Sequence, residues 1–143
     1  MNQYRKLKDR QQEEVNNFPL GFAFSEKQFD EMMTNRGFDP KKDLWKISRL
    51  PIGGGFIRKS DIPAFRSMME RHRAETQEAI DKDPDGKGFI YDMFRYELDN
   101  HEYGYTGDAE EALSCLGYTL EEIENDKRLK AGFKKACKAI MAN

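Results

Sequence analysis

The stretch "DKDPDGKGFIYDMFRYELDNHEYG", residues 81–104, joins a polar, glycine-containing segment to a helical pattern. Asp-Pro-Asp-Gly at residues 83–86 is typical of a turn. After it, side chains at three- and four-residue spacing predict one buried helix face, and Gly104 is expected to end the helix. The stretch therefore predicts an elbow followed by a core helix at 89–103. The side chains on its inner face are Ile90, Met93, Phe94, Glu97, Leu98 and His101.

Helix signals also precede and follow this stretch. Residues 60–80, "SDIPAFRSMMERHRAETQEAI", begin with a serine or aspartate cap, place Pro63 in the first turn and continue with apolar side chains at helical spacing. Residues 3–15 are polar with few apolar positions, which indicates a marginal helix or an arm. Further capping and periodic patterns predict helices at 25–37, 108–117, 119–123 and 126–141.

Residues 43–59, "DLWKISRLPIGGGFIRK", contain the clearest strand signals. Trp45 precedes the turn-forming "PIGGG" and Phe56 follows it, so a β-hairpin is predicted. Residues 20–24, "LGFAF", indicate a short buried strand or extended segment. The predicted fold class is α+β, mainly α, with four to six helices packed with a small antiparallel β-hairpin or sheet.

Length and composition indicate one folded domain, residues 1–143, with residues 1–17 included in it or forming a helical arm. Hydrophobic residues make up 38% and charged residues 35%, and 10 Phe, 6 Tyr and 7 Met provide core material that disordered chains lack. No apolar run is long enough to span a bilayer, no secretory leader is present, and two cysteines are too few for a disulfide framework. We therefore expect a cytoplasmic protein with no membrane contact and no cofactor.

Charge is unevenly distributed along the chain. Residues 81–126 carry 14 acidic and 3 basic side chains, whereas residues 127–143 carry 6 basic side chains and no acidic one. Such asymmetry can create faces of opposite potential that steer partners by sign. It can also arise simply because acidic residues suit helix starts and basic residues suit helix ends. The sequence leaves both explanations open. Direct nucleic-acid binding is not expected, because the isoelectric point is near 5.8.

The acidic elbow has nearly the spacing of a calcium-binding EF-hand loop. Gly86 stands at the sixth position, but Phe89 at the ninth offers no side-chain oxygen, Pro84 restricts the backbone before it, and the sequence has no second such loop. The interpretation that we favour is an elbow without tight calcium binding. The candidate metal set at the first, third, fifth and twelfth positions is Asp81, Asp83, Asp85 and Asp92.

The two histidines lie on the apolar faces of their predicted helices. If these helices fold back on each other as an antiparallel pair, His72 and His101 come within about one helical turn, with Glu97 on the same face. Such a cluster can bind a metal or shuttle a proton. No reliable third ligand or nucleophile signature accompanies it, so we expect both histidines to be structural. Cys115 and Cys137 lack metal-binding spacing and are expected to pack as small hydrophobic residues.

Three segments together resemble a known group of proteins: "FAFSEKQF" (22–29), "GGGFIRKSD" (53–61) and "GFIYDMFRYELDNHEYGYTGDAEEALSCLGYT" (88–119). They are similar to a family of small uncharacterised proteins encoded by Firmicutes and by their phages and mobile elements. The resemblance covers most of the chain from Phe18 onward. It implies a bacterial, cytoplasmic setting, and it assigns neither a reaction nor a catalytic residue.

These observations favour a non-enzymatic interaction or regulatory protein that binds a protein partner through an acidic surface. The alternatives are a calcium-binding module at residues 81–92, or a small enzyme built on histidine and glutamate. The acidic side chains can instead do no more than cap two short helices, with the tyrosines packed inward. The residues expected at the partner surface are Asp108, Glu110, Glu111, Glu121, Glu122 and Glu124, with Tyr105 and Tyr118 nearby.

Overall fold

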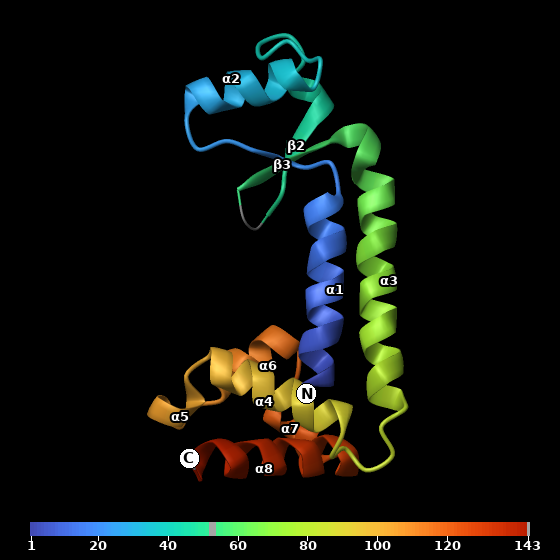
Figure 1. The fold of residues 1–143 in the computed structure, drawn as a ribbon, viewed down its shortest axis with the longest axis vertical. Helices are drawn as coiled ribbons and strands as arrows, with labels where there is room; N and C mark the ends of the chain where they lie inside the picture. The colour runs from blue at the N-terminus through green and yellow to red at the C-terminus, as the bar shows by residue number, and fades with distance from the viewer. Residues whose placement is uncertain (52–53, 143) are drawn as a thin grey trace. The chain divides into compact units, whose positions relative to one another are not determined.

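A computed structural model describes residues 1–51 and 54–142 of the chain. These residues form eight α-helices and a three-stranded antiparallel sheet (Figure 1), which confirms the mainly helical α+β class. The chain divides into two compact units: the sheet unit, residues 12–72, and the helical unit, residues 1–11 with 73–143. This division does not test whether the chain is a single domain, which stays a prediction.

The helices match the predicted ranges, with two additions. The polar N-terminal segment forms a complete helix, and a short helix follows the predicted core helix, which raises the number of helices above the expected four to six. The helices are α1 (Gln3–Asn17), α2 (Glu26–Asn35), α3 (Ile62–Asp81), α4 (Phe89–Asn100), α5 (Tyr103–Thr106), α6 (Glu110–Leu116), α7 (Leu120–Glu124) and α8 (Lys127–Met141). The strands are β1 (Gly21–Phe22), β2 (Ile47–Arg49) and β3 (Gly55–Arg58).

The sheet unit is organised around β3, which pairs antiparallel with β1 on one side and β2 on the other. Gly21 lies opposite Phe56, and Ile47 lies opposite Arg58. Ile57 on β3 is buried, so the central strand contributes directly to the core of this unit. The two strands of the predicted hairpin are confirmed, while Ile52 and Gly53 of its turn lie outside the described residues.

Two expectations for the sheet unit are wrong. The first concerns burial at residues 20–24: the expected short strand is present as the two-residue β1, but the side chains of Phe22 and Phe24 are 55% and 81% exposed. Trp45 lies in a 3-10 turn before β2 and is 67% exposed. Aromatic side chains favour strands only where neighbouring strands and core side chains cover them, and these positions fall at the edges of a small sheet.

The helical unit has α4 at its centre, packed against α8, α6 and α5 (Figure 1). The predicted inner face of α4 is buried, including Ile90, Met93, Phe94 and Leu98. The Phe94 ring meets Phe133 of α8 edge-on, with ring centroids 5.3 Å apart. Fully burying each such side chain contributes about 1.5–3 kcal/mol relative to exposure, so this face adds several kcal/mol to the stability of the unit.

Two glycines bring α8 close to α4 and to the elbow. A Cβ atom at Gly132 of α8 would lie 2.7 Å from the Ile90 side chain and 3.1 Å from the backbone nitrogen of Tyr91. Gly86 has a φ of +79°, and a Cβ there would overlap the carbonyl group of Arg128. Both contacts involve backbone or fully packed atoms, so neither position has room for a side chain.

The core helix ends earlier than Gly104, the residue expected to terminate it. Glu102 adopts a left-handed conformation, with a φ of 57°, so α4 ends at Asn100 with His101 as its C-cap, and α5 begins at Tyr103. Gly104 lies inside α5. His101 therefore stands at the C-terminal end of α4, beside the turn between the two helices.

Candidate functional site

Asp83 is the organising residue of the elbow. Its side chain is buried, and its carboxylate accepts hydrogen bonds from the backbone N–H groups of Gly86 (3.1 Å), Gly88 (3.1 Å) and Ile90 (2.9 Å). These donors include groups at the start of α4, where helical N–H groups have no partner within the helix. The Arg128 guanidinium donates to the Asp83 carbonyl oxygen at 2.7 Å. This arrangement supports the elbow interpretation, because the carboxylate is already occupied by backbone donors.

The other three aspartates of the candidate calcium set have separate partners. Asp81 accepts a hydrogen bond from the Gln77 side chain (2.9 Å), Asp85 from the backbone of Lys87 (2.9 Å) and Asp92 from the backbone of Gln3 (2.8 Å). Across residues 1–51 and 54–142, none of the side-chain groups with metal-ligand spacing contains any of the four aspartates. The absence of tight calcium binding by this segment stays a prediction for experiment.

Some acidic residues of the expected partner surface cap helices. Asp108 accepts a hydrogen bond from the Glu110 backbone at 2.9 Å, before the start of α6. Thr119 and Glu122 form a complete capping box at the start of α7. Capping accounts for Glu122, Asp108 holds the turn before α6, and Glu124 pairs with Lys130 at 3.0 Å. All six expected carboxylates are nevertheless exposed to solvent: Asp108, Glu110, Glu111, Glu121, Glu122 and Glu124.

A groove lies beside these carboxylates within the helical unit. Its volume is about 690 Å³, and residues of α5, α6, α7 and α8 line it. Leu113, Tyr118, Leu120 and Phe133 provide apolar and aromatic surface, and Leu120 is 59% exposed. Of the two expected tyrosines, Tyr118 lines the groove and is half-buried, with desolvation followed by nearby acidic charges raising its pKa. Tyr105 is 93% exposed on α5.

Glu97 is a buried carboxylate with side-chain partners. It is 2% exposed, and its Oε1 atom accepts hydrogen bonds from the Tyr4 hydroxyl (2.9 Å) and the Lys8 ammonium group (3.3 Å). Its Oε2 atom lies 3.5 Å from Nε2 of His101. Burial, and then the charge of Glu97, raise the pKa of Tyr4, so its hydroxyl stays protonated as a donor. The two oxygens of Glu97 therefore face different groups.

Cys115 of α6 completes this cluster. Glu97, His101 and Cys115 each present a ligand atom, and these atoms lie within 4.8 Å of one another. Cys115 is exposed as a residue, but desolvation of its sulfur, and then the charge of Glu97, raise the pKa of its thiol. Lys8 acts in the opposite direction. We name Glu97, His101 and Cys115 the Glu–His–Cys centre.

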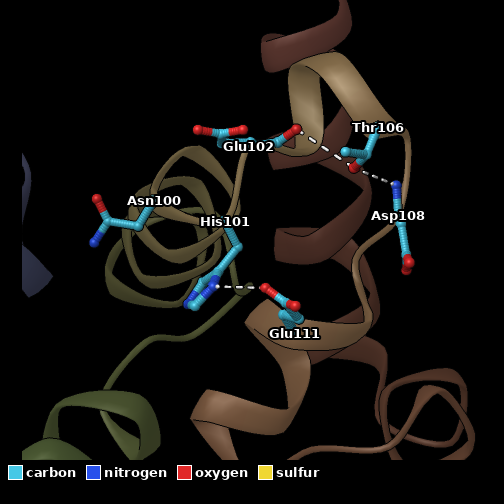
Figure 2. A pocket seen from close by; sticks show the side chains of 6 residues that line it. All are labelled: Asn100, His101, Glu102, Thr106, Asp108 and Glu111. Atoms are coloured by element: carbon cyan, nitrogen blue, oxygen red, sulfur yellow. Dashed lines mark hydrogen bonds and ion pairs between the residues drawn. The ribbon is translucent and has the colours of Figure 1, made fainter.

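A pocket opens on the His101 side of the centre. Its volume is about 300 Å³, and Asn100, His101, Glu102, Thr106, Asp108 and Glu111 line it. Figure 2 shows the imidazole of His101, at the end of α4, directed toward the carboxylate of Glu111 on α6. Nδ1 of His101 lies 3.6 Å from Oε2 of Glu111. The imidazole is thus positioned between two carboxylates, one on each ring nitrogen.

The structure divides the histidine set expected from sequence. Glu97 and His101 lie together in the helical unit, whereas His72 belongs to the sheet unit, where its Nε2 atom is 3.4 Å from Oε2 of Glu14. Glu14 also pairs with Arg71, and hydrogen bonding by that guanidinium lowers the pKa of Glu14 to about 2. Each histidine therefore has its own carboxylate partner.

Cys115 is the residue that sequence reasoning missed. We expected it to pack as a small hydrophobic residue, but it is exposed and lies beside Glu97. The Glu97–His101 spacing of four residues is the one available signal, because it places both side chains on the same face of a helix. Cys115 comes 14 positions after His101, on another helix, so only the packing of α6 on α4 reveals it.

Comparison with known proteins identifies the family of the chain but adds no activity. Neither the curated proteins nor the solved structures gave a match. Within the part of the chain that the structure describes, no helix has the length and apolar character needed to cross a bilayer. One family profile, described as a family of unknown function, matches residues 3–139. The chain belongs to this family, DUF7659.

Proposed function

We propose that this protein acts by binding a partner protein, without catalysis, and that the groove lined by α5, α6, α7 and α8 receives a basic, amphipathic segment of that partner. The observation that carries the proposal is the combination of an apolar groove of about 690 Å³ with exposed carboxylates at its border. Grooves of about 300–1,000 Å³ are large enough to bury side chains of a bound ligand.

The groove walls offer the contact area that a partner needs. Tyr118 and Phe133 present partly covered aromatic surface over the buried Leu113, and Leu120 remains 59% exposed at the edge. Removing such surface from water is worth about 25 cal/mol per Å², and aromatic side chains in pockets commonly dominate binding energy. An apolar side chain of a partner can therefore gain affinity here.

The acidic side chains at the border of the groove favour a partner segment with positive charge. Asp108 and Glu110 line the groove, and Glu121 and Glu124 are exposed on the neighbouring α7. Negative charge at the rim accelerates association with a positively charged segment and disfavours an acidic one. A segment with leucines on one face and lysines or arginines on the other meets both requirements, because its apolar face contacts the walls and its basic face contacts the rim.

The test uses a defined peptide. A fluorescent helical peptide of about four turns, with leucines on one face and lysines on the other, is titrated with the protein, and binding is followed by fluorescence anisotropy. We expect saturable binding, with NMR amide shift changes concentrated in residues 107–120. The charge-reversed peptide, with glutamates in place of lysines, should bind at least tenfold more weakly.

Matched variants give the control. Leu120→Asp should weaken peptide binding at least tenfold, whereas Leu44→Asp should leave it unchanged, because Leu44 is an exposed leucine of the sheet unit. Glu110→Lys should weaken binding and reduce its salt dependence. Equal binding of both peptides, or equal effects of the two leucine variants, would refute the proposal. Concentration-dependent dimerisation abolished by Leu120→Asp would show that a second copy of the chain occupies the groove instead.

A further inference from the structure

We propose that the Glu–His–Cys centre is a zinc site, with Oε2 of Glu97, Nε2 of His101 and Sγ of Cys115 as its three protein ligands. Zinc binds this mixture of oxygen, nitrogen and sulfur, usually with four ligands in tetrahedral arrangement. Sites with three protein ligands leave a fourth position for water or another small ligand. Cys115 is exposed, so the centre is open to solvent on the side of this ligand.

The first argument is that the two oxygens of the Glu97 carboxylate contact different groups. Tyr4 and Lys8 both donate to Oε1, at 2.9 Å and 3.3 Å, and hold the buried carboxylate in one orientation. Oε2 lies 3.5 Å from Nε2 of His101, and the carboxylate also offers an oxygen within 4.8 Å of the Cys115 sulfur. A carboxylate that is fixed through one oxygen and presents the other is the usual arrangement of a metal ligand with supporting hydrogen bonds.

The second argument is the environment of His101. Its Nε2 atom faces Oε2 of Glu97 at 3.5 Å, while its Nδ1 atom faces Oε2 of Glu111 at 3.6 Å on the pocket side (Figure 2). Histidines that bind metal through one ring nitrogen commonly donate the N–H of the other to a carboxylate. Glu111 is suited to this supporting role, because it fixes the tautomer in which Nε2 carries a free lone pair.

The third argument is the distance between the ligand atoms. Zinc–ligand bonds of about 2.0–2.3 Å in a tetrahedron place neighbouring ligand atoms about 3.3–3.8 Å apart. The 3.5 Å between Glu97 and His101 already lies in this range, and all three atoms lie within 4.8 Å of one another. Cys115 is exposed, so a shift on the order of 1 Å at its sulfur completes the geometry without disturbing the core.

Ligand chemistry selects zinc over the commoner divalent ions. Calcium and magnesium prefer oxygen ligands throughout, so sulfur at Cys115 and nitrogen at His101 disfavour both. Metal binding replaces the thiol proton of Cys115 by the metal, which yields a zinc–thiolate bond and releases the proton to solvent. No oxidant or reductant takes part in this step.

The test measures metal binding by the whole chain under reducing conditions. Zinc is titrated in competition with a chromogenic chelator, and cobalt(II) is titrated separately, because a cobalt–thiolate bond produces a strong charge-transfer absorption. We expect one zinc per chain and a cobalt–thiolate band. In Cys115→Ser and in His101→Gln, the cobalt–thiolate band should be lost and the zinc affinity should fall at least tenfold.

Cys137→Ser is the matched control, because Cys137 is the second cysteine, lies on α8 in the same unit and is no member of the centre. It should keep both signals. Circular dichroism shows whether each variant is folded, and the exposed Cys115 position makes Cys115→Ser decisive by itself. Absence of the cobalt–thiolate band in the parent protein, its persistence in folded Cys115→Ser, or its loss in folded Cys137→Ser would overturn the proposal.

Discussion

Two buried carboxylates in the helical unit, Asp83 and Glu97, accept hydrogen bonds from different kinds of donor. Asp83 accepts three backbone N–H groups of the elbow and the start of α4. Glu97 accepts hydrogen bonds from the side chains of Tyr4 and Lys8 through Oε1, while Oε2 lies 3.5 Å from His101 and Cys115 lies within 4.8 Å of the cluster. Both are at most 6% exposed, so burial alone does not distinguish a structural carboxylate from a candidate functional one.

The identity of the donors is what distinguishes them. Backbone donors move only if the chain itself refolds, so Asp83 can hardly exchange its partners for a ligand. Side-chain donors leave the second oxygen of Glu97 able to bind another group. We therefore expect Asp83 to stabilise the fold of the elbow and Glu97 to bind a ligand in the Glu–His–Cys centre. Separate experiments can test the two roles.

The largest expected effect is that of Asp83→Ala. The variant removes the acceptor of three backbone N–H groups, two of which are at buried positions, and should lower the free energy of unfolding by about 3 kcal/mol. Asp85→Ala, an exposed neighbour with one backbone hydrogen bond, is the control and should lower it by no more than about 0.5–1 kcal/mol. Urea denaturation measures both values, and equal losses would contradict the structural role of Asp83.

Glu97→Gln should be less destabilising than Asp83→Ala. Glutamine keeps an acceptor for Tyr4 but loses the ionic contact with Lys8, so we expect a loss of about 1–2 kcal/mol in urea denaturation. Tyr4→Phe removes a single neutral donor and should cost about 1 kcal/mol. Zinc binding separates the roles: it should be lost in Glu97→Gln but only weakened, by about tenfold, in Tyr4→Phe, where the carboxylate ligand remains. A stability loss in Glu97→Gln with unchanged zinc affinity would reduce Glu97 to a structural group.

A smaller effect concerns the reactivity of Cys115. Desolvation and the charge of Glu97 raise the pKa of its thiol, so less thiolate is present at neutral pH than in a free thiol, and the alkylation rate should increase as the pH rises toward that pKa. Lys8 lowers this pKa, so Lys8→Met should slow alkylation about threefold at neutral pH. Mass spectrometry after timed iodoacetamide treatment measures the rate. Lys6→Met, on the same helix, should change nothing, and a faster rate in Lys8→Met would contradict the electrostatic account.

The smallest expected effect is that of calcium on the elbow. Because backbone N–H groups already occupy the Asp83 carboxylate, isothermal titration with calcium should give no saturable heat at micromolar concentrations. A weak response that disappears with added salt is compatible with this expectation, because any acidic segment attracts divalent ions. Micromolar affinity abolished by Asp85→Ala would show that the loop rearranges to bind calcium.

The sequence predicts the parts of this structure that depend on neighbours along the chain. The capping pair Thr119 and Glu122 is separated by three residues, and the structure confirms the capping box. The buried face of α4 follows from its periodicity, and the turn at the elbow follows from Asp-Pro-Asp-Gly. These features depend on local geometry, which a single sequence specifies well.

The candidate site depends on contacts between segments distant in sequence. Tyr4 approaches Glu97 from 93 positions away, and Cys115 approaches it from a different helix. Periodicity assigns Glu97 to an inner face but does not say which side chains it meets there. For the same reason, placing His72 beside His101 required an assumption about how two helices fold back, and the structure assigns the two histidines to different units.

Because only glycine fits at position 132, a genetic experiment can detect the close contact between α8 and α4. Glycine inside an exposed helix costs about 1 kcal/mol relative to alanine, so selection for helix formation alone would remove it. Here even a methyl group would collide with Ile90 and the backbone of Tyr91. In a library that encodes every amino acid at codon 132, selection for folded protein should return glycine alone. This one codon can therefore serve as a genetic reporter of whether the two helices still meet at this distance.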